Sequence, residues 1–221
     1  MAYLPYRGRY NRRSIVTITP PTGDAVSTAD MKTYLRVDHT DDDALIAAFV
    51  DTATEAAKQY TRQALLTEVL ELRMDGFPGD DDERIVMLGG GMHDAHYRTV
   101  LGGVGEVDLP FTPIQSLDSI TTYDRGNAPS VLSSAAYSTD LYGGRVYLND
   151  GYTWPTDLRD RDAVYVRYTA GYGAAAIPLP IVQAIKQHVE AMYECRGGCA
   201  MPEGCKALLT PYKRYDQLGW F

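Results

Sequence analysis

The sequence lacks several features that would place it outside the ordinary globular proteins. It has three cysteines, all between positions 195 and 205, and no apolar run of about 18 residues. An odd number of closely spaced cysteines is not typical of a disulfide framework, and without a long apolar run we expect no membrane partner. The opening residues are basic and have no apolar core of a secretion signal, so we expect synthesis in the cytoplasm.

Positive charge is scarce relative to negative charge. The 21 lysines and arginines stand against 29 aspartates and glutamates, which gives a net charge of −8. Such a balance argues against a protein that grips duplex DNA or anionic lipid over its whole surface, because phosphate contacts need cations. The first thirteen residues nevertheless hold Arg7, Arg9, Arg12 and Arg13 and no acidic residue. We predict residues 1–23 as a basic extended arm, either a frayed terminus or a strap that binds a partner.

Apolar residues recur at helical spacing near both ends of the chain. Two patterns, Ser27 with Asp30 and Thr40 with Asp43, are capping boxes that predict where the first two helices begin. After the second box, apolar side chains from Leu45 to Tyr60 recur every three or four residues and predict one long helix. The predicted helices span residues 27–36, 41–64, 180–195 and 203–210.

Between these helices the apolar period falls to about 2, as in strands with one buried face. The strands predicted in this way cover residues 70–74, 117–123, 137–142, 145–148 and 164–168. Gly143 and Gly144 predict a two-residue hairpin turn, because glycine accepts a positive φ. We therefore predict a mostly antiparallel β subdomain over residues 65–172, with an acidic and glycine-rich loop insertion at 80–106.

The fold class that follows is α+β: a helical bundle from the N- and C-terminal helices, with the β subdomain inserted between them. A chain of 221 residues is long enough to bury one substantial core. We place the main domain at residues 24–215 and a C-terminal tail at 216–221.

Residues that could carry catalysis are present but poorly arranged. His188, Cys195, Cys199 and Cys205 are possible zinc ligands by type, yet their spacing lacks the short pairs of a structural zinc site. Two acidic runs, 41–43 and 80–83, suit a helix N-terminus and a solvated loop as well as they suit a divalent cation. We predict no catalytic residue, no metal and no cofactor. A small metal-dependent enzyme that uses these groups stays open as the alternative.

Aromatic residues are strongly biased, with 17 tyrosines and 4 phenylalanines. Tyrosine tolerates half-exposed positions and is enriched at protein interfaces. The last ten residues begin at Tyr212 and end in Trp220 and Phe221, at a free end that has no evident core to enter. The tail is therefore either a docking peptide or an ordinary packed segment.

In order along the chain, a set of short segments resembles the phage head-tail connector (adaptor) family of long-tailed phages and related gene transfer particles. The resemblance runs from about residue 24 to 215, and no single segment is diagnostic. The segments are residues 31–38, 41–46, 60–65, 75–78, 109–110, 113–116, 168–173, 177–178 and 208–212. The sequence departs from the family at about 80–106, where relatives pass quickly to the next strand.

The resemblance implies a virion protein that assembles as a dodecameric ring in the neck, between the portal and the stopper or tail-completion protein. Genomic double-stranded DNA would pass through the ring without specific binding, and assembly would take place in the host cytoplasm. It also implies portal docking by the C-terminal segment, for which we predict Tyr212, Arg214, Tyr215, Trp220 and Phe221. For the subunit interface we predict Leu45, Phe49 and Tyr60 on the long helix. Another neck protein, such as a stopper or tail-completion protein, is the alternative within the same class.

Overall fold

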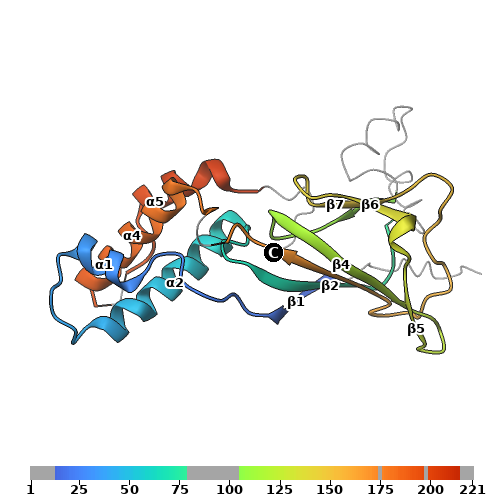
Figure 1. Ribbon diagram of the computed structural model, residues 1–221, viewed down its shortest axis with the longest axis horizontal. Helices are drawn as coiled ribbons and strands as arrows, with labels where there is room; N and C mark the ends of the chain where they lie inside the picture. Colours follow the sequence, from blue (N-terminus) through green and yellow to red (C-terminus); the bar gives the residue numbers. More distant parts are fainter. Residues whose placement is uncertain (1–12, 79–104, 174–175, 197–198, 215–221) are drawn as a thin grey trace, which may run out of the picture.

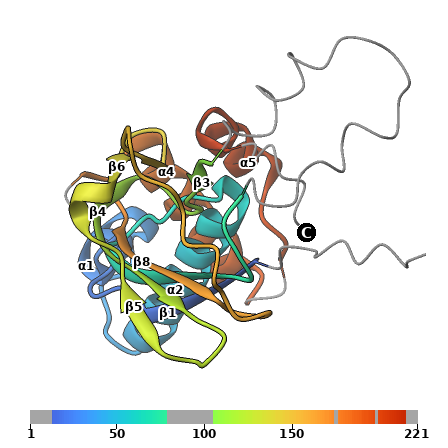
Figure 2. The same ribbon diagram turned by 90° about the vertical axis from the view of Figure 1, so that its right-hand side faces the viewer.

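The computed structural model describes residues 13–78, 105–173, 176–196 and 199–214 (Figure 1). Helices gather at one end of an elongated molecule and two β-sheets at the other, and Figure 2 looks at it from the sheet end. Most of the predicted insertion at 80–106 lies outside the described residues. So do the first part of the predicted arm, Tyr215, and the tail at 216–221.

The helical end is a small bundle around one apolar core. Its helices are α1 (Thr28–Leu35), α2 (Asp43–Thr61), α4 (Leu179–Glu194) and α5 (Glu203–Leu209), followed by the 3-10 turn η4 (Thr210–Tyr212). Helix α4 packs between α2 and α5, and α1 closes the side. Fully buried side chains that face each other across this core include Met31, Ile46, Val50, Ile181, Ile185 and Leu209.

The two predicted capping boxes have different outcomes. Ser27 caps α1 as predicted, because its Oγ accepts the backbone N–H of Asp30 at 3.1 Å. The second box is wrong: the N-cap of α2 is Asp42, and no side chain bonds there. Thr40 uses its backbone carbonyl to accept the N–H of Asp43 at 3.2 Å, so its side chain is not the cap.

The larger sheet has five antiparallel strands in the order β1-β2-β8-β4-β5. They are β1 (Arg13–Thr19), β2 (Glu68–Met74), β8 (Val164–Ala170), β4 (Ile114–Tyr123) and β5 (Pro129–Val131). Strand β1 corrects the predicted arm at 1–23, since residues 13–19 are part of the sheet. Ile15 pairs with Leu72 of β2 and packs against the sheet core, so strand pairing and apolar contact both stabilise this segment.

The smaller sheet has the order β3-β7-β6, with β3 (Val107–Asp108), β7 (Arg145–Leu148) and β6 (Tyr137–Asp140). The short 3-10 turn η2 (Ser134–Ala136) leads into β6. The predicted two-residue turn is wrong: β6 ends at Asp140, and residues 141–144 form the connection. Asp140 explains the longer turn, because its Oδ1 accepts the Gly143 N–H and its carbonyl accepts the Gly144 N–H, both at 2.8 Å.

The two sheets enclose a second core. Its buried members come from both sheets and include Leu70, Leu72, Met74, Val107, Val146, Val164, Val166 and Tyr168. Alternating residues of β2 and β8 supply seven of the sixteen buried residues that the described chain places in this core, as their period of two predicts. The structure thus confirms the α+β class and the insertion of a mostly antiparallel β unit between terminal helices.

Backbone contacts join the helical bundle to the sheets just beyond the end of α2. The Ala64 N–H donates to the carbonyl of Thr112 at 3.1 Å, next to a cis peptide bond between Thr112 and Pro113. Gly171 has a φ of +119°, and a Cβ there would lie 2.1 Å from the carbonyl oxygen of Leu66. Only glycine lets the two backbones approach this closely.

Candidate functional site

The C-terminal segment crosses from the helical bundle to the small sheet, and Arg214 holds it there. Its backbone N–H donates to the carbonyl of Thr61, the last residue of α2, at 2.9 Å. Its guanidinium donates to Thr112 Oγ1 through Nη1, and to the carbonyl of Gly143 through Nη2 at 2.9 Å. One residue thus ties together α2, the loop before β4 and the β6–β7 turn.

Tight packing around Gly144 supports this contact. Gly144 is buried with a φ of +68°, and a Cβ there would lie 2.4 Å from Thr112 Cγ2 and 3.4 Å from Arg214 Nη1. The Leu109 N–H donates to the Gly144 carbonyl at 2.7 Å, so the turn is also bonded to the residue that follows β3. The sequence predicts a turn at these glycines. It does not predict that Arg214 binds the turn, because Arg214 lies about seventy residues further along the chain.

Tyrosines surround the point where the described chain ends. We define the tyrosine patch as Leu141, Tyr142, Tyr172 and Tyr212. Tyr142 is 94% exposed and Leu141 42% exposed, whereas Tyr172 and Tyr212 are half-buried. Burial raises the pKa of Tyr172, and the nearby Tyr212, Arg214 and Tyr142 also act on that pKa, with Arg214 lowering it. These residues therefore lie close together although they come from three separate parts of the chain.

Of the five residues predicted for portal docking, the structure describes Tyr212 and Arg214; Tyr215, Trp220 and Phe221 lie outside the described residues. Tyr212 belongs to the tyrosine patch. Arg214 was predicted for docking, but its guanidinium is bonded within its own chain. These bonds anchor the last described residue of the chain on Thr112 and on the β6–β7 turn.

The three residues predicted for the subunit interface lie apart along α2. Leu45 is 44% exposed near the start of the helix, and Phe49 is half-buried one turn further on. Tyr60 faces the C-terminal segment of its own chain: its hydroxyl lies 3.1 Å from Thr210 Oγ1, and Lys213 Nζ lies 5.0 Å from its ring centre. Tyr60 therefore supports the segment that leads to Arg214.

The possible zinc ligands do not come together. His188 is buried in α4, where burial lowers its pKa and its Nδ1 has no hydrogen-bond partner. Cys195 and Cys199 are joined in a disulfide, which corrects the expectation that these cysteines would not pair, and Cys205 is buried and free. Their closeness in sequence permits the bond, with Cα atoms 6.2 Å apart. No group of three His, Cys, Asp or Glu residues suits a metal ion within the four described ranges.

The acidic run at 41–43 is used within the fold. Asp42 Oδ2 accepts the hydroxyl of Tyr193 at 2.6 Å, and Asp43 Oδ1 pairs with Lys32 Nζ at 2.6 Å. These two carboxylates join α2 to α4 and to α1. The second acidic run, at 80–83, lies outside the described residues.

The sequence pattern did not predict a charged cluster that lies on the open face of the large sheet. Glu71 is only 3% exposed and bonds to Arg73 Nε at 2.9 Å and Arg167 Nη2 at 2.8 Å. Burial would raise the pKa of Glu71, but the hydrogen bonds from Arg167 and Arg73 outweigh it and the pKa is lowered. The register places Glu71 opposite Arg167, and the strand alternation alone does not reveal which strands are neighbours.

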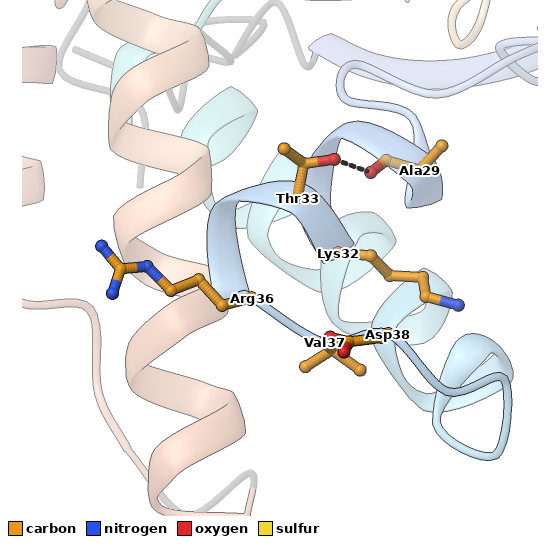
Figure 3. Close-up of a pocket in the computed structure, with 6 residues that line it drawn as sticks. All are labelled: Ala29, Lys32, Thr33, Arg36, Val37 and Asp38. Carbon is orange, nitrogen blue, oxygen red and sulfur yellow. Dashed lines mark hydrogen bonds between the residues drawn. The ribbon is translucent and has the colours of Figure 1, made fainter.

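A shallow depression lies at the end of α1, lined by Ala29, Lys32, Thr33, Arg36, Val37 and Asp38 (Figure 3). Its two cations point away from each other, Arg36 toward α4 and Lys32 to the opposite side. Lys32 is paired with Asp43, and Thr33 Oγ1 donates to the carbonyl of Ala29 at 3.0 Å. The depression brings no polar groups together for catalysis.

Among the described helices, none has the length and apolar character needed to cross a membrane. Residues 27–127 match the family described as phage gp6-like head-tail connector protein. Over this stretch the chain matches the head-tail connector family. The matched stretch contains α1, α2, β2, β3 and β4, so it includes elements of both the bundle and the sheets. The family predicted by resemblance is thereby confirmed.

The connector chain also has the fold of subunits in solved gene transfer agent (GTA) particles. A chain from the neck of an empty GTA particle, with C6 symmetry, matches with a TM-score of 0.68 and 22% identity, over 94% of this chain and 98% of that chain. A chain from the virion of a native GTA particle gives 0.68 and 20%, over 93% and 98%. A chain from a native GTA neck with C12 symmetry gives 0.64 and 21%, over 94% and 98%. No curated protein matches the sequence.

Proposed function

We propose that this chain is a structural head-tail connector. Identical copies form a ring in the neck of a phage-like virion, between the portal and the stopper or tail-completion protein, and keep the DNA channel continuous. The observation that carries the proposal is the family match over residues 27–127. It is supported by a fold shared with GTA neck subunits along nearly the whole chain.

A dodecamer is the ring size that we propose, since one similar chain comes from a neck with C12 symmetry. A closed ring needs two different flanks on each subunit, which complement each other by rotation. The exposed side of α2 around Leu45 is our candidate for one flank. Phe49 lies beside it, and we assign Tyr60 to the support of the C-terminal segment.

In this proposal the ring neither holds the DNA nor catalyses a reaction. The net charge of −8 disfavours the phosphate contacts that would hold duplex DNA, so the genome can pass without binding. We propose that the chain is not an enzyme and uses no cofactor. The metal-dependent alternative gains nothing from the described residues, in which His188 and the cysteines are used by the core and by a disulfide.

For portal docking we propose the aromatic tail, with Tyr215, Trp220 and Phe221 as contacts and Tyr212 at its base. Arg214 fixes the base of the tail on the domain, through its bonds to Thr112 and Gly143. Many identical tails on one ring raise the effective concentration of each contact, so a weak single contact suffices.

The proposal is tested by mass measurement in solution with and without the portal, together with a pull-down of the portal. We expect a ring-sized mass in the presence of the portal. A variant that lacks Leu218–Phe221 should keep its fold by circular dichroism and lose most portal binding.

The matched control is Tyr152→Ser, which changes an exposed tyrosine outside the tail and should bind the portal normally. A chain that stays monomeric with the portal contradicts the connector function. Unchanged portal binding by the truncated chain contradicts the docking role of the tail alone.

A further inference from the structure

The tip of the β6–β7 turn presents apolar surface on a rigid support. Tyr142 is 94% exposed and Leu141 42% exposed. Three hydrogen bonds fix the turn. The N–H groups of Gly143 and Gly144 donate to Asp140, and the N–H of Leu109 donates to Gly144, with donor–acceptor distances of 2.7 to 2.8 Å. A tyrosine ring held on a fixed turn loses little conformational freedom when a partner covers it, so this tip is well prepared for binding.

The base of the C-terminal tail lies directly beside this tip. Arg214 Nη2 bonds to the carbonyl of Gly143, the residue that follows Tyr142. Tyr212 and Tyr172 extend the apolar surface from the tip to the end of the described chain. The structure therefore brings Arg214, the last described residue, to the tyrosine patch.

The segment beyond Arg214 has the length and the side chains to cover the patch. Residues 215–221 include Tyr215, Leu218, Trp220 and Phe221. At about 3.3 Å per extended residue the segment reaches on the order of 20 Å, so its aromatic end can return to a patch that begins beside its root. A tether this short gives an effective concentration in the millimolar range, which favours the chain's own tail over a free partner.

We propose that the tyrosine patch, formed by Leu141, Tyr142, Tyr172 and Tyr212, is the seat of the chain's own C-terminal segment, residues 215–221. In the free subunit the ring of Trp220 or Phe221 stacks on Tyr142. A partner that binds the tail must then take it from this seat, and the tip becomes exposed. The seat is argued from contacts of the single chain and does not depend on the proposed portal docking.

The test uses the full chain with 5-fluorotryptophan, which gives one ¹⁹F resonance for Trp154 and one for Trp220. Trp154 is an internal control, because it stacks on Phe77 at 4.1 Å and its Nε1 donates to the carbonyl of Gly105 at 2.8 Å. We expect Trp220 to be protected from a soluble paramagnetic agent, independently of protein concentration. In Tyr142→Ser we expect the relaxation enhancement at Trp220 to rise severalfold while Trp154 is unchanged.

The matched control is Tyr152→Ser, a second exposed tyrosine, which should leave Trp220 protected. Two results would overturn the proposal: a Trp220 resonance as accessible as in the isolated peptide 215–221, or one that Tyr142→Ser does not change. Protection that grows with protein concentration would also overturn it, since the occupant is then the tail of a second copy. An unchanged Trp154 resonance shows that the variant is folded, and portal binding is measured separately.

Discussion

His188 shows how one buried side chain sets a response to pH. It lies in the core of the bundle at 6% exposure, with Nδ1 unpaired, and burial lowers its pKa. Its ordinary pKa is about 6.5, so the unfolded chain takes up a proton below that pH before the folded chain does. Protons bound preferentially by the unfolded state reduce stability.

We therefore expect the free energy of unfolding to fall as the pH drops from 7 to 5. His188→Gln, which does not titrate, should weaken this dependence in that range. Urea unfolding at several pH values measures both slopes. An equal slope for His188→Gln and the unmodified chain would show that His188 is not the responsible group.

Among the connecting elements, the β6–β7 turn carries the sharpest prediction. Gly144→Ala places a Cβ 2.4 Å from Thr112 Cγ2 at a φ of +68°, so both strain and overlap oppose it. We expect a loss of about 2–4 kcal/mol in the free energy of unfolding. Gly151 has a φ of +84° with nothing within 4 Å of its Cβ position, so Gly151→Ala should lose only about 1 kcal/mol. Chemical denaturation of the two variants checks the difference, and equal losses would contradict the packing argument.

Elements with a strong period could be predicted from the sequence, and contacts between distant elements could not. The apolar spacing after Leu45 predicts α2, although the buried stripe runs through Ile46 and Val50 while Leu45 is exposed. Strand β1 was missed because its few apolar residues follow a basic, tyrosine-rich stretch that has no clear period. The hydrophobic pattern predicts which face of a helix or strand is buried. It does not predict well where an element ends or which strand lies at the edge of a sheet.

The candidate site was predictable only in part, for the same physical reason. The aromatic tail is visible in the composition, and Tyr212 lies two residues before the end of the described chain. The bonds from Arg214 to Gly143 and from Arg167 to Glu71 join residues 71 and 96 positions apart, and nothing local in the sequence marks them. The Cys195–Cys199 disulfide was likewise missed, because an odd number of cysteines argued against pairing.

At the scale of the whole molecule, the ring depends on surface that the folded subunit leaves open. Leu45 is 44% exposed on α2, so Leu45→Arg should leave the free energy of unfolding within about 0.5 kcal/mol of the unmodified chain. In the proposed ring it would place a charge in an apolar contact, and we expect assembly with the portal to be lost. Light scattering measures the mass. Val131→Arg, at 67% exposure on β5, is the control outside α2. A ring of normal mass formed by Leu45→Arg would show that this part of α2 does not belong to the interface.

Among the described elements, a strand of the sheet end and a helix of the helical end follow each other directly along the chain three times, from Thr19 to Thr28, from Thr61 to Glu68 and from Ala170 to Leu179. The two ends lie along the long axis of the molecule (Figure 1). A pull along that axis is therefore divided among three covalent paths in parallel, with the Arg214 contacts as a fourth, weaker one. Tension between head and tail would have to stretch several backbones at once before the two halves of a subunit came apart.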